Sequence, residues 1–306
     1  MLDEFQSVVV TVLWLAVTIA ASAHVVLKKR DVRAALGWVG LVWLAPVAGA
    51  IAYALFGVNR IRRRALALRP GLRPRQDAEG LPSLGALELP EPAAHLASLV
   101  SLGDQVVRRP LAPGNRVELL RGGEAAYPAM IAAIDAAERS VTFCTYLFDP
   151  GRAGDAFVDA FVRARWRGVQ VRVLVDAVGA RYRWPPAHRA LRKAGVPVAL
   201  FLERLAPAWL PFVNLRNHRK ILVADGRVGF TGGMNVRDDF LPGPDRPVPF
   251  QDLQVRVEGP VVAHLQSTFT EDWLFTTGER LDGVAFFPAL PEAGPVLARG
   301  IVDRPD

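Results

Sequence analysis

The chain has little cysteine and no recognisable metal-binding motif. Its 306 residues include one cysteine, Cys144, in the apolar run VTFCTYLF. A single cysteine excludes a disulfide framework and a cysteine-rich zinc site within one chain. The H-E-x-x-H pattern of zinc hydrolases is also absent from the sequence. We therefore expect no metal and no cofactor, and Cys144 is interpreted as a small core residue.

Charge is missing from two long stretches near the N-terminus. Residues 8–27 and residues 34–59 contain no Asp, Glu, Lys or Arg. Twenty helical residues rise about 30 Å, which matches the hydrocarbon core of a bilayer. Because only a short basic segment separates the two runs, the pattern predicts a two-helix transmembrane hairpin over residues 1–60. Both ends of the hairpin would then lie on the same side of the membrane.

Two other interpretations of these runs are less consistent with their flanks and composition. In a cleaved signal peptide the positive charges precede the apolar run, whereas here they follow it. A buried helix of a globular domain normally shows a polar stripe, and neither run has one. The arginines after the second run determine the predicted orientation of the hairpin in the membrane. By the positive-inside rule they place the C-terminal part of the chain in the cytoplasm, although the segment that connects the two runs is basic too. These arginines are Arg60, Arg62, Arg63, Arg64, Arg69, Arg73 and Arg75.

The rest of the chain is divided by composition and by hydrophobic periodicity. Residues 61–113 form a basic linker rich in Pro and Gly, with one short helix expected near residues 92–102. Residues 114–277 alternate strand-like and amphipathic helix-like segments, which predicts an α/β fold with a mixed or largely parallel sheet covered by helices on both faces. Residues 278–306 form a tail. The formal net charge of +7 favours anionic partners, either phospholipid head groups or nucleic acid.

The segment NHRKILVADGRVGFTGGMN, residues 217–235, contains the residues best suited to chemistry. Side chains alternate along a strand, so His218 and Lys220 are expected on one face. Lys220 can neutralise a phosphoryl oxygen as negative charge develops in the transition state. His218 can act as a nucleophile or as a proton donor near neutral pH. The pair therefore predicts an attack on phosphodiesters, and the neighbouring lysine opposes a metal-binding role for His218.

Two further features of this segment suit a phosphate ligand. Gly232 and Gly233 permit close approach of the backbone. The side-chain amide of Asn235 can donate a hydrogen bond to a phosphoryl oxygen.

The spacing His-x-Lys-x4-Asp, which ends at Asp225, is followed by x6-Gly-Gly-x-Asn. This combination resembles the signature of the phospholipase D superfamily. The resemblance implies a mixed β-sheet flanked by helices and a catalytic histidine. It also implies that Asp225 is mainly architectural and stabilises the loop after the strand.

The resemblance extends to a narrower family. An apolar hairpin ending in YALFGVNR, a linker and the motif together look like a bacterial cardiolipin synthase, and residues 252–275 resemble the segment after the first motif in that family. The resemblance implies an inner-membrane enzyme that joins two phosphatidylglycerols through a phosphatidyl-histidine and releases glycerol. Asp252 is the candidate carboxylate for the far nitrogen of His218, and the alternative is an ordinary carboxylate at the start of a strand.

The family reaction needs two histidines, one to attack phosphorus and one to protonate the leaving alkoxide. The other histidines are His24, His95, His188 and His264, and none has Lys two positions later. The end of the chain, PVLARGIVDRPD, resembles the opening strand of the family's second half. Three explanations remain open: a truncated product with little activity, a homodimer that brings two His218 side chains together, or a separately encoded second half.

Three functions remain in competition. The first is a membrane-anchored phosphatidyltransferase of the cardiolipin synthase type acting on phosphatidylglycerol. The second is a single-motif dimeric nuclease or phospholipase of the same superfamily, whose positive charge suits nucleic acid. Because much of the arginine lies next to the apolar runs, nucleic acid is the less favoured partner. The third is a catalytically silent membrane protein.

Overall fold

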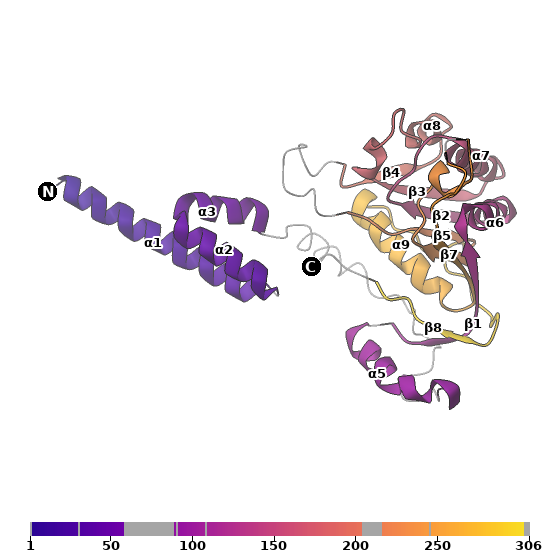
Figure 1. Cartoon of the computed structure of the whole chain (residues 1–306), viewed down its shortest axis with the longest axis horizontal. Helices are drawn as coiled ribbons and strands as arrows, with labels where there is room; N and C mark the ends of the chain where they lie inside the picture. The colour runs from indigo at the N-terminus through magenta and orange to yellow at the C-terminus, as the bar shows by residue number, and fades with distance from the viewer. Residues whose placement is uncertain are drawn as a thin grey trace. The chain divides into compact units, whose positions relative to one another are not determined.

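The computed structural model describes residues 2–29, 31–57, 89, 91–107, 109–203, 216–244 and 246–302. These residues form two compact units, an N-terminal helical unit and a larger α/β unit (Figure 1).

The N-terminal unit begins with one long helix, α1 (Leu2–Lys28), whose side chains are largely exposed. Its segment Phe5–Lys28 is long and apolar enough to cross a membrane. The next helix, α2 (Val32–Leu44), begins where the Asp31 carboxylate accepts hydrogen bonds from the backbone N–H groups of residues 33 and 34. The first predicted span is therefore present as a single helix.

The second apolar run forms two helices, divided at one residue, rather than one continuous helix. The chain breaks at Ala45, whose φ of −139° and ψ of 70° are not helical, and α3 (Pro46–Ala52) starts at the next residue. Proline has no N–H to donate, and its ring clashes with the carbonyl four residues earlier, so the helix restarts there. A short π-helical turn, η1 (Tyr53–Gly57), follows α3. At about 1.5 Å per residue, neither piece reaches the about 30 Å that a span requires.

The two short helices fold back on each other and on α1. A side chain at Gly49 would overlap the backbone of Leu41 and Val42, so glycine allows α3 to lie directly against α2. Val25, Val42 and Tyr53 form the buried centre of the unit. The Tyr53 hydroxyl lies 2.8 Å from His24 Nδ1, which gives both polar groups a partner in an apolar environment.

The α/β unit is built on an eight-stranded mixed sheet with the order β4-β3-β2-β5-β6-β7-β1-β8. Strands β2, β3 and β4 are parallel, and the remaining pairs are antiparallel. The strands are β1 (Ala112–Arg121), β2 (Ser140–Thr145), β3 (Gln170–Asp176), β4 (Val198–Phe201), β5 (Ile221–Ala224), β6 (Val228–Gly232), β7 (Leu253–Glu258) and β8 (Val296–Ala298). The predicted α/β class with a mixed sheet is confirmed.

Helices cover both faces of this sheet (Figure 1). The longer ones are α6 (Gly122–Ala136), α7 (Arg152–Trp166) and α9 (Val262–Thr277), and the shorter ones are α8 (His188–Lys193), η4 (Gly179–Arg181) and η6 (Asp238–Phe240). Within β5, Leu222 and Ala224 belong to the core beside α6 and α7, whereas Ile221 and Val223 belong to the core beside α9. A strand buried on both faces is continuously apolar, which explains the run ILVA.

The structure describes part of the predicted linker and places part of the predicted tail in the sheet. Of the predicted linker, residues 61–88 lie outside the described residues, while η3 (Glu91–Leu96) and α5 (Ala97–Val106) confirm a short helical segment. Residues of the predicted tail pair with β1 as strand β8. The tail therefore contributes an edge strand to the same sheet.

The aromatic core between β2 and α7 should dominate the stability of the α/β unit. Phe161 is fully buried and its ring centroid lies 5.3 Å from that of Phe143. We expect Phe161→Ala to lower the free energy of unfolding by about 3–5 kcal/mol, because it removes a large apolar contact and leaves a cavity. Urea unfolding of the detergent-solubilised chain, followed by circular dichroism, measures this loss.

Trp166, at the end of the same helix, is the matched control because it is 79% exposed. Its replacement by Ala should change stability by less than about 0.5 kcal/mol. Equal losses in the two variants would contradict the assigned core.

Candidate active site

The strand ends along one edge of the sheet, across several neighbouring strands, bring together segments that are far apart in the sequence. The parallel strands β2 and β3 end there, and because β5 runs antiparallel to β2, it begins there. By the same alternation β6 ends and β7 begins at this edge. We call this the His218 edge, because His218 lies just before β5. Asn235 follows β6 and Asp252 precedes β7, so most of the predicted site residues meet here.

The imidazole of His218 is exposed to solvent and lies against an aromatic ring. Its ring centroid is 5.0 Å from that of Tyr146, which follows β2. Partial burial and the positive charge of Lys220 lower the pKa of His218, and the Asp176 carboxylate opposes them. The imidazole is therefore neutral at neutral pH, which is the state in which it can attack phosphorus.

Lys220 is buried beneath this ring system. Its side chain is 4% exposed, and its Nζ donates a 2.6 Å hydrogen bond to the backbone carbonyl of His218. The ammonium lies 5.7 Å from the centroid of the Tyr146 ring. Burial lowers the pKa of Lys220 to about 8, even though nearby carboxylates favour the charged form. The structure thus places His218 and Lys220 together, beside a tyrosine that the sequence analysis did not single out.

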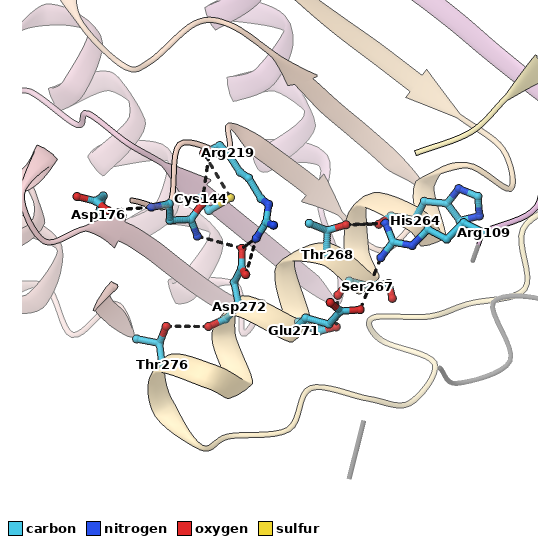
Figure 2. Close-up of polar contacts among 12 residues, drawn as sticks. Arg109, Cys144, Asp176, Arg219, His264, Ser267, Thr268, Glu271, Asp272 and Thr276 are labelled. Atoms are coloured by element: carbon cyan, nitrogen blue, oxygen red, sulfur yellow. Dashed lines mark hydrogen bonds and ion pairs between the residues drawn. The ribbon is translucent and has the colours of Figure 1, made fainter. Parts of the chain in front are cut away.

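Two carboxylates, those of Asp176 and Asp272, bind the residues on either side of His218 (Figure 2). Asp176, at the end of β3, accepts a 2.9 Å hydrogen bond from Asn217 N. Asp272 of α9 accepts a 3.0 Å hydrogen bond from Asn217 Nδ2 and forms an ion pair with Arg219. Burial works against the guanidinium charge, but the Asp272 charge outweighs it and raises the pKa of Arg219. The residues on both sides of His218 are therefore held in place by carboxylates of β3 and α9.

The sequence analysis missed both of these carboxylates. A signal for Asp176 was present, because a carboxylate directly after a buried strand needs partners. Asp272 gave no such signal, since its partners are more than fifty residues away along the chain.

Asn235 is oriented with its amide nitrogen available as a donor. Its Oδ1 accepts a 3.0 Å hydrogen bond from Leu147 N. A backbone N–H can only donate, so the oxygen must face it and Nδ2 must point elsewhere. Within the ranges that the structure describes, no group accepts a hydrogen bond from this Nδ2. The predicted contact with a phosphoryl oxygen is compatible with this orientation.

Gly232 and Gly233 allow two neighbouring strands to pack closely, in addition to any approach of a ligand. A Cβ at Gly232 would overlap the carbonyl of Leu253, and one at Gly233 would overlap the Asp252 carboxylate. The absence of a side chain at both positions therefore lets the end of β6 lie against the start of β7.

Asp252 does not make the contact that was expected of it. Its carboxylate accepts a 2.7 Å hydrogen bond from Leu253 N, and across the described part of the chain no hydrogen bond joins it to His218. Its negative charge raises the pKa of Lys220, whereas the carboxylate that raises the pKa of His218 is Asp176. Asp252 thus lies at the His218 edge as a carboxylate at the start of a strand.

Asp225 lies at the opposite end of β5 from His218. Four strand residues, about 13 Å at about 3.3 Å each, separate it from Lys220. Its carboxylate accepts hydrogen bonds of 2.7 to 2.9 Å from three successive backbone N–H groups, those of Glu138, Arg139 and Ser140. These contacts tie the turn after β5 to the start of β2. Asp225 has a φ of +52°, a conformation that aspartate tolerates better than most residues.

Within the described part of the α/β unit, no hydrogen bond or ring contact joins a second histidine to His218. His24 contacts Tyr53 in the N-terminal unit, and His264 is buried in α9, where its Nδ1 accepts a hydrogen bond from Gly300 N. Burial lowers the pKa of His264 to about 4, so it stays neutral. Among the described residues, no cluster of three or more His, Cys, Asp and Glu side chains could hold a metal ion.

Comparison with known families agrees with this geometry. Residues 130–273 match the family described as "Cardiolipin synthase, PLD-like domain", and residues 12–57 match the "Phospholipase_D-nuclease N-terminal" family. The part of the α/β unit that contains the His218 edge is therefore similar to a phospholipase D-like domain.

The curated relatives lead to a particular group within that class. The chain is 31% identical to "Cardiolipin synthase 1" of Bacillus anthracis over 275 residues, which cover 88% of this chain and 53% of the relative. It is 31% identical to "Cardiolipin synthase A" of Pseudomonas putida over 303 residues, which cover 94% of this chain and 60% of the relative. The chain is thus related to bacterial cardiolipin synthases and spans little more than half of their length.

The position of Asp225 leads to a prediction that separates folding from chemistry. We expect Asp225→Ala to destabilise the chain by about 1–3 kcal/mol, because three backbone N–H groups lose their acceptor. Asp225→Asn should cost less, since an amide oxygen can still accept. The midpoint of urea unfolding of each variant measures the effect.

Asp159 is exposed on α7 and provides the control, for which Asp159→Ala should leave the midpoint unchanged. Loss of activity in Asp225→Ala at wild-type stability would contradict the architectural role.

Proposed function

We propose that this chain is a membrane-anchored phosphatidyltransferase of the cardiolipin synthase type, which acts on phosphatidylglycerol through a phosphatidyl-histidine at His218. The observation that carries the proposal is the exposed, neutral imidazole of His218 above the buried ammonium of Lys220 at one edge of the sheet. The names of the curated relatives support the lipid substrate.

The geometry supports a two-step transfer. In the first step a ring nitrogen of His218 forms a bond to phosphorus, while the bond from phosphorus to the glycerol head-group oxygen breaks and that oxygen takes up a proton. Lys220 and the Asn235 amide stabilise the negative charge on the phosphoryl oxygens. In the second step a hydroxyl of another phosphatidylglycerol loses its proton and attacks phosphorus, which releases His218.

Both steps need a second proton-transfer group opposite His218. A homodimer about a two-fold axis would supply the partner's own copy of this histidine. A complementary second half would serve the same purpose.

The membrane location that we propose rests on α1 and on the arginine-rich sequence. Helix α1 and the second apolar run together anchor the chain in the inner membrane as the predicted multi-pass hairpin, in which α2 and α3 combine because each alone is too short to span it. The arginines that follow residue 59 place the phospholipase D-like domain on the cytoplasmic side.

The function is tested by comparing lipid and nucleic-acid turnover. We expect the chain reconstituted in vesicles to convert labelled phosphatidylglycerol to cardiolipin, and His218→Ala to lower the rate at least about a thousandfold. His95→Ala, an exposed position in η3, is the matched control and should retain full activity. Cleavage of single-stranded DNA that depends on His218 would instead support a nuclease, and turnover of neither substrate would support a silent protein.

The same activity should depend on pH in a bell-shaped manner. The rate constant kcat/KM should rise as the attacking His218 loses its proton, at a pH below 6.5. It should fall first as the proton donor opposite His218 loses its proton, and again near pH 8 as Lys220 loses its own. Lys220→Arg keeps its charge at higher pH, so the fall near pH 8 should move upward even where the rate is reduced. A fall that stays near pH 8 in this variant would exclude Lys220 as its cause.

A further inference from the structure

Two loops of the α/β unit expose large apolar side chains to solvent. In the loop after η4, Tyr182 is 63% and Trp184 is 76% exposed. In the loop before β7, Val248 is 76% and Phe250 is 46% exposed. Soluble surfaces rarely group such side chains without a partner.

The first loop lies beside the His218 edge, because the Tyr182 ring centroid is 6.3 Å from that of Tyr146, the ring that contacts His218. A cleft of about 300 Å³ separates Arg183 and Trp184 of this loop from Asp238 and Asp239. The second loop is bound to the far side of the cleft, where Arg246 pairs with Asp239 and Phe250 N donates to the Asp239 carbonyl. We call residues 181–184 and 246–250 together the rim.

The rim is positively charged as well as apolar. Its two segments contain Arg181, Arg183 and Arg246 and no Asp or Glu. Three aspartates line the cleft, and each has partners. Asp149 is paired with Arg183 and Arg237, and Asp239 is paired with Arg237 and Arg246. Asp238 accepts from the backbone N–H groups of residues 152 and 153.

Two arginine side chains stack on exposed aromatic rings of the rim. The Arg246 guanidinium lies 4.1 Å from the centroid of the Phe250 ring, and Arg189 of α8 lies 4.1 Å from that of Trp184. Such stacking keeps the rings outward and places a cation beside each of them.

We propose that the rim docks on the surface of an anionic phospholipid bilayer and so presents the His218 edge to the lipid head groups. Aromatic side chains favour the head-group region of a bilayer, and arginines beside them bind its phosphates. Docking deepens the proposed function and rests on it, because a lipid substrate then reaches His218 without leaving the bilayer. Single-stranded nucleic acid also stacks on aromatic rings, but Val248 offers no ring, and its exposed aliphatic surface favours lipid.

The opposite edge of the sheet offers a matched control. Trp166 ends α7, which starts at the His218 edge and runs to the other edge, where β3 begins. It is 79% exposed, almost the same as Trp184. The native Cys144 does not interfere with labelling, because its thiol is buried and burial raises its pKa to about 12.

The test places a fluorescent label at each tryptophan position. Trp184→Cys and Trp166→Cys are labelled with bimane, and the full chain is reconstituted in vesicles that contain phosphatidylglycerol and a lipid-borne nitroxide quencher. We expect quenching at position 184 to exceed that at position 166 several-fold and to fall in vesicles of phosphatidylcholine alone. Equal quenching at the two positions would overturn the proposal. Protection of position 184 by single-stranded DNA, without lipid quenching, would also overturn it and assign the rim to nucleic acid.

A kinetic measurement separates this proposal from the proposed function. On phosphatidylglycerol in vesicles, Trp184→Ala should be about tenfold slower than wild type, whereas Trp166→Ala should not be slowed. On a short-chain, water-soluble phosphatidylglycerol both variants should match wild type. Equal losses on both forms of the substrate would assign Trp184 to the site rather than to docking. If no variant turns over phosphatidylglycerol, the proposed function fails, while the quenching result still decides whether the rim meets lipid.

Discussion

The His218 edge depends on the pairing of β5 with β2. This four-residue strand is hydrogen-bonded to β2 on one side and to β6 on the other, and both of its faces are buried. Because β5 runs antiparallel to β2, the residues before it meet the residues after β2 and β3. If β5 ran parallel to β2 instead, His218 and Lys220 would lie at the opposite ends of the strands, away from Tyr146 and Asp176. The chemistry therefore follows from the topology of one short, apolar strand.

Around this strand the structure divides support and reactivity between different groups. Asp176 and Asp272 bind the residues on either side of His218, so the imidazole itself is left exposed. Lys220, in contrast, is buried and donates a hydrogen bond to the backbone carbonyl of His218. A cation held in a poorly solvated position interacts more strongly with an arriving anion than a solvated one does. The site thus combines an accessible imidazole with a shielded positive charge.

The sequence was sufficient to predict the α/β class, the first apolar helix and the pairing of His218 with Lys220, because each of these depends on local periodicity or spacing. It also indicated that Asp225 acts on the loop, and the three backbone donors that Asp225 binds agree with that role. Asp272 and Tyr146 could not be predicted, because their importance arises from contacts between distant segments. The expected bond between Asp252 and His218 failed for the same reason, since spacing along a strand does not determine how a side chain turns. The division of the second apolar run into two helices could not be predicted, because composition shows that a segment is apolar, whereas the break at Ala45 comes from backbone geometry at Pro46.

The lowered pKa of Lys220 has a consequence for ligand binding itself. With a pKa of about 8, about a tenth of the molecules carry a neutral amine at this position at pH 7. An anion that settles against Lys220 stabilises the ammonium and draws a proton from solution in those molecules. Binding of an anion at this position is thereby linked to proton uptake, so its measured enthalpy will vary with the ionisation heat of the buffer.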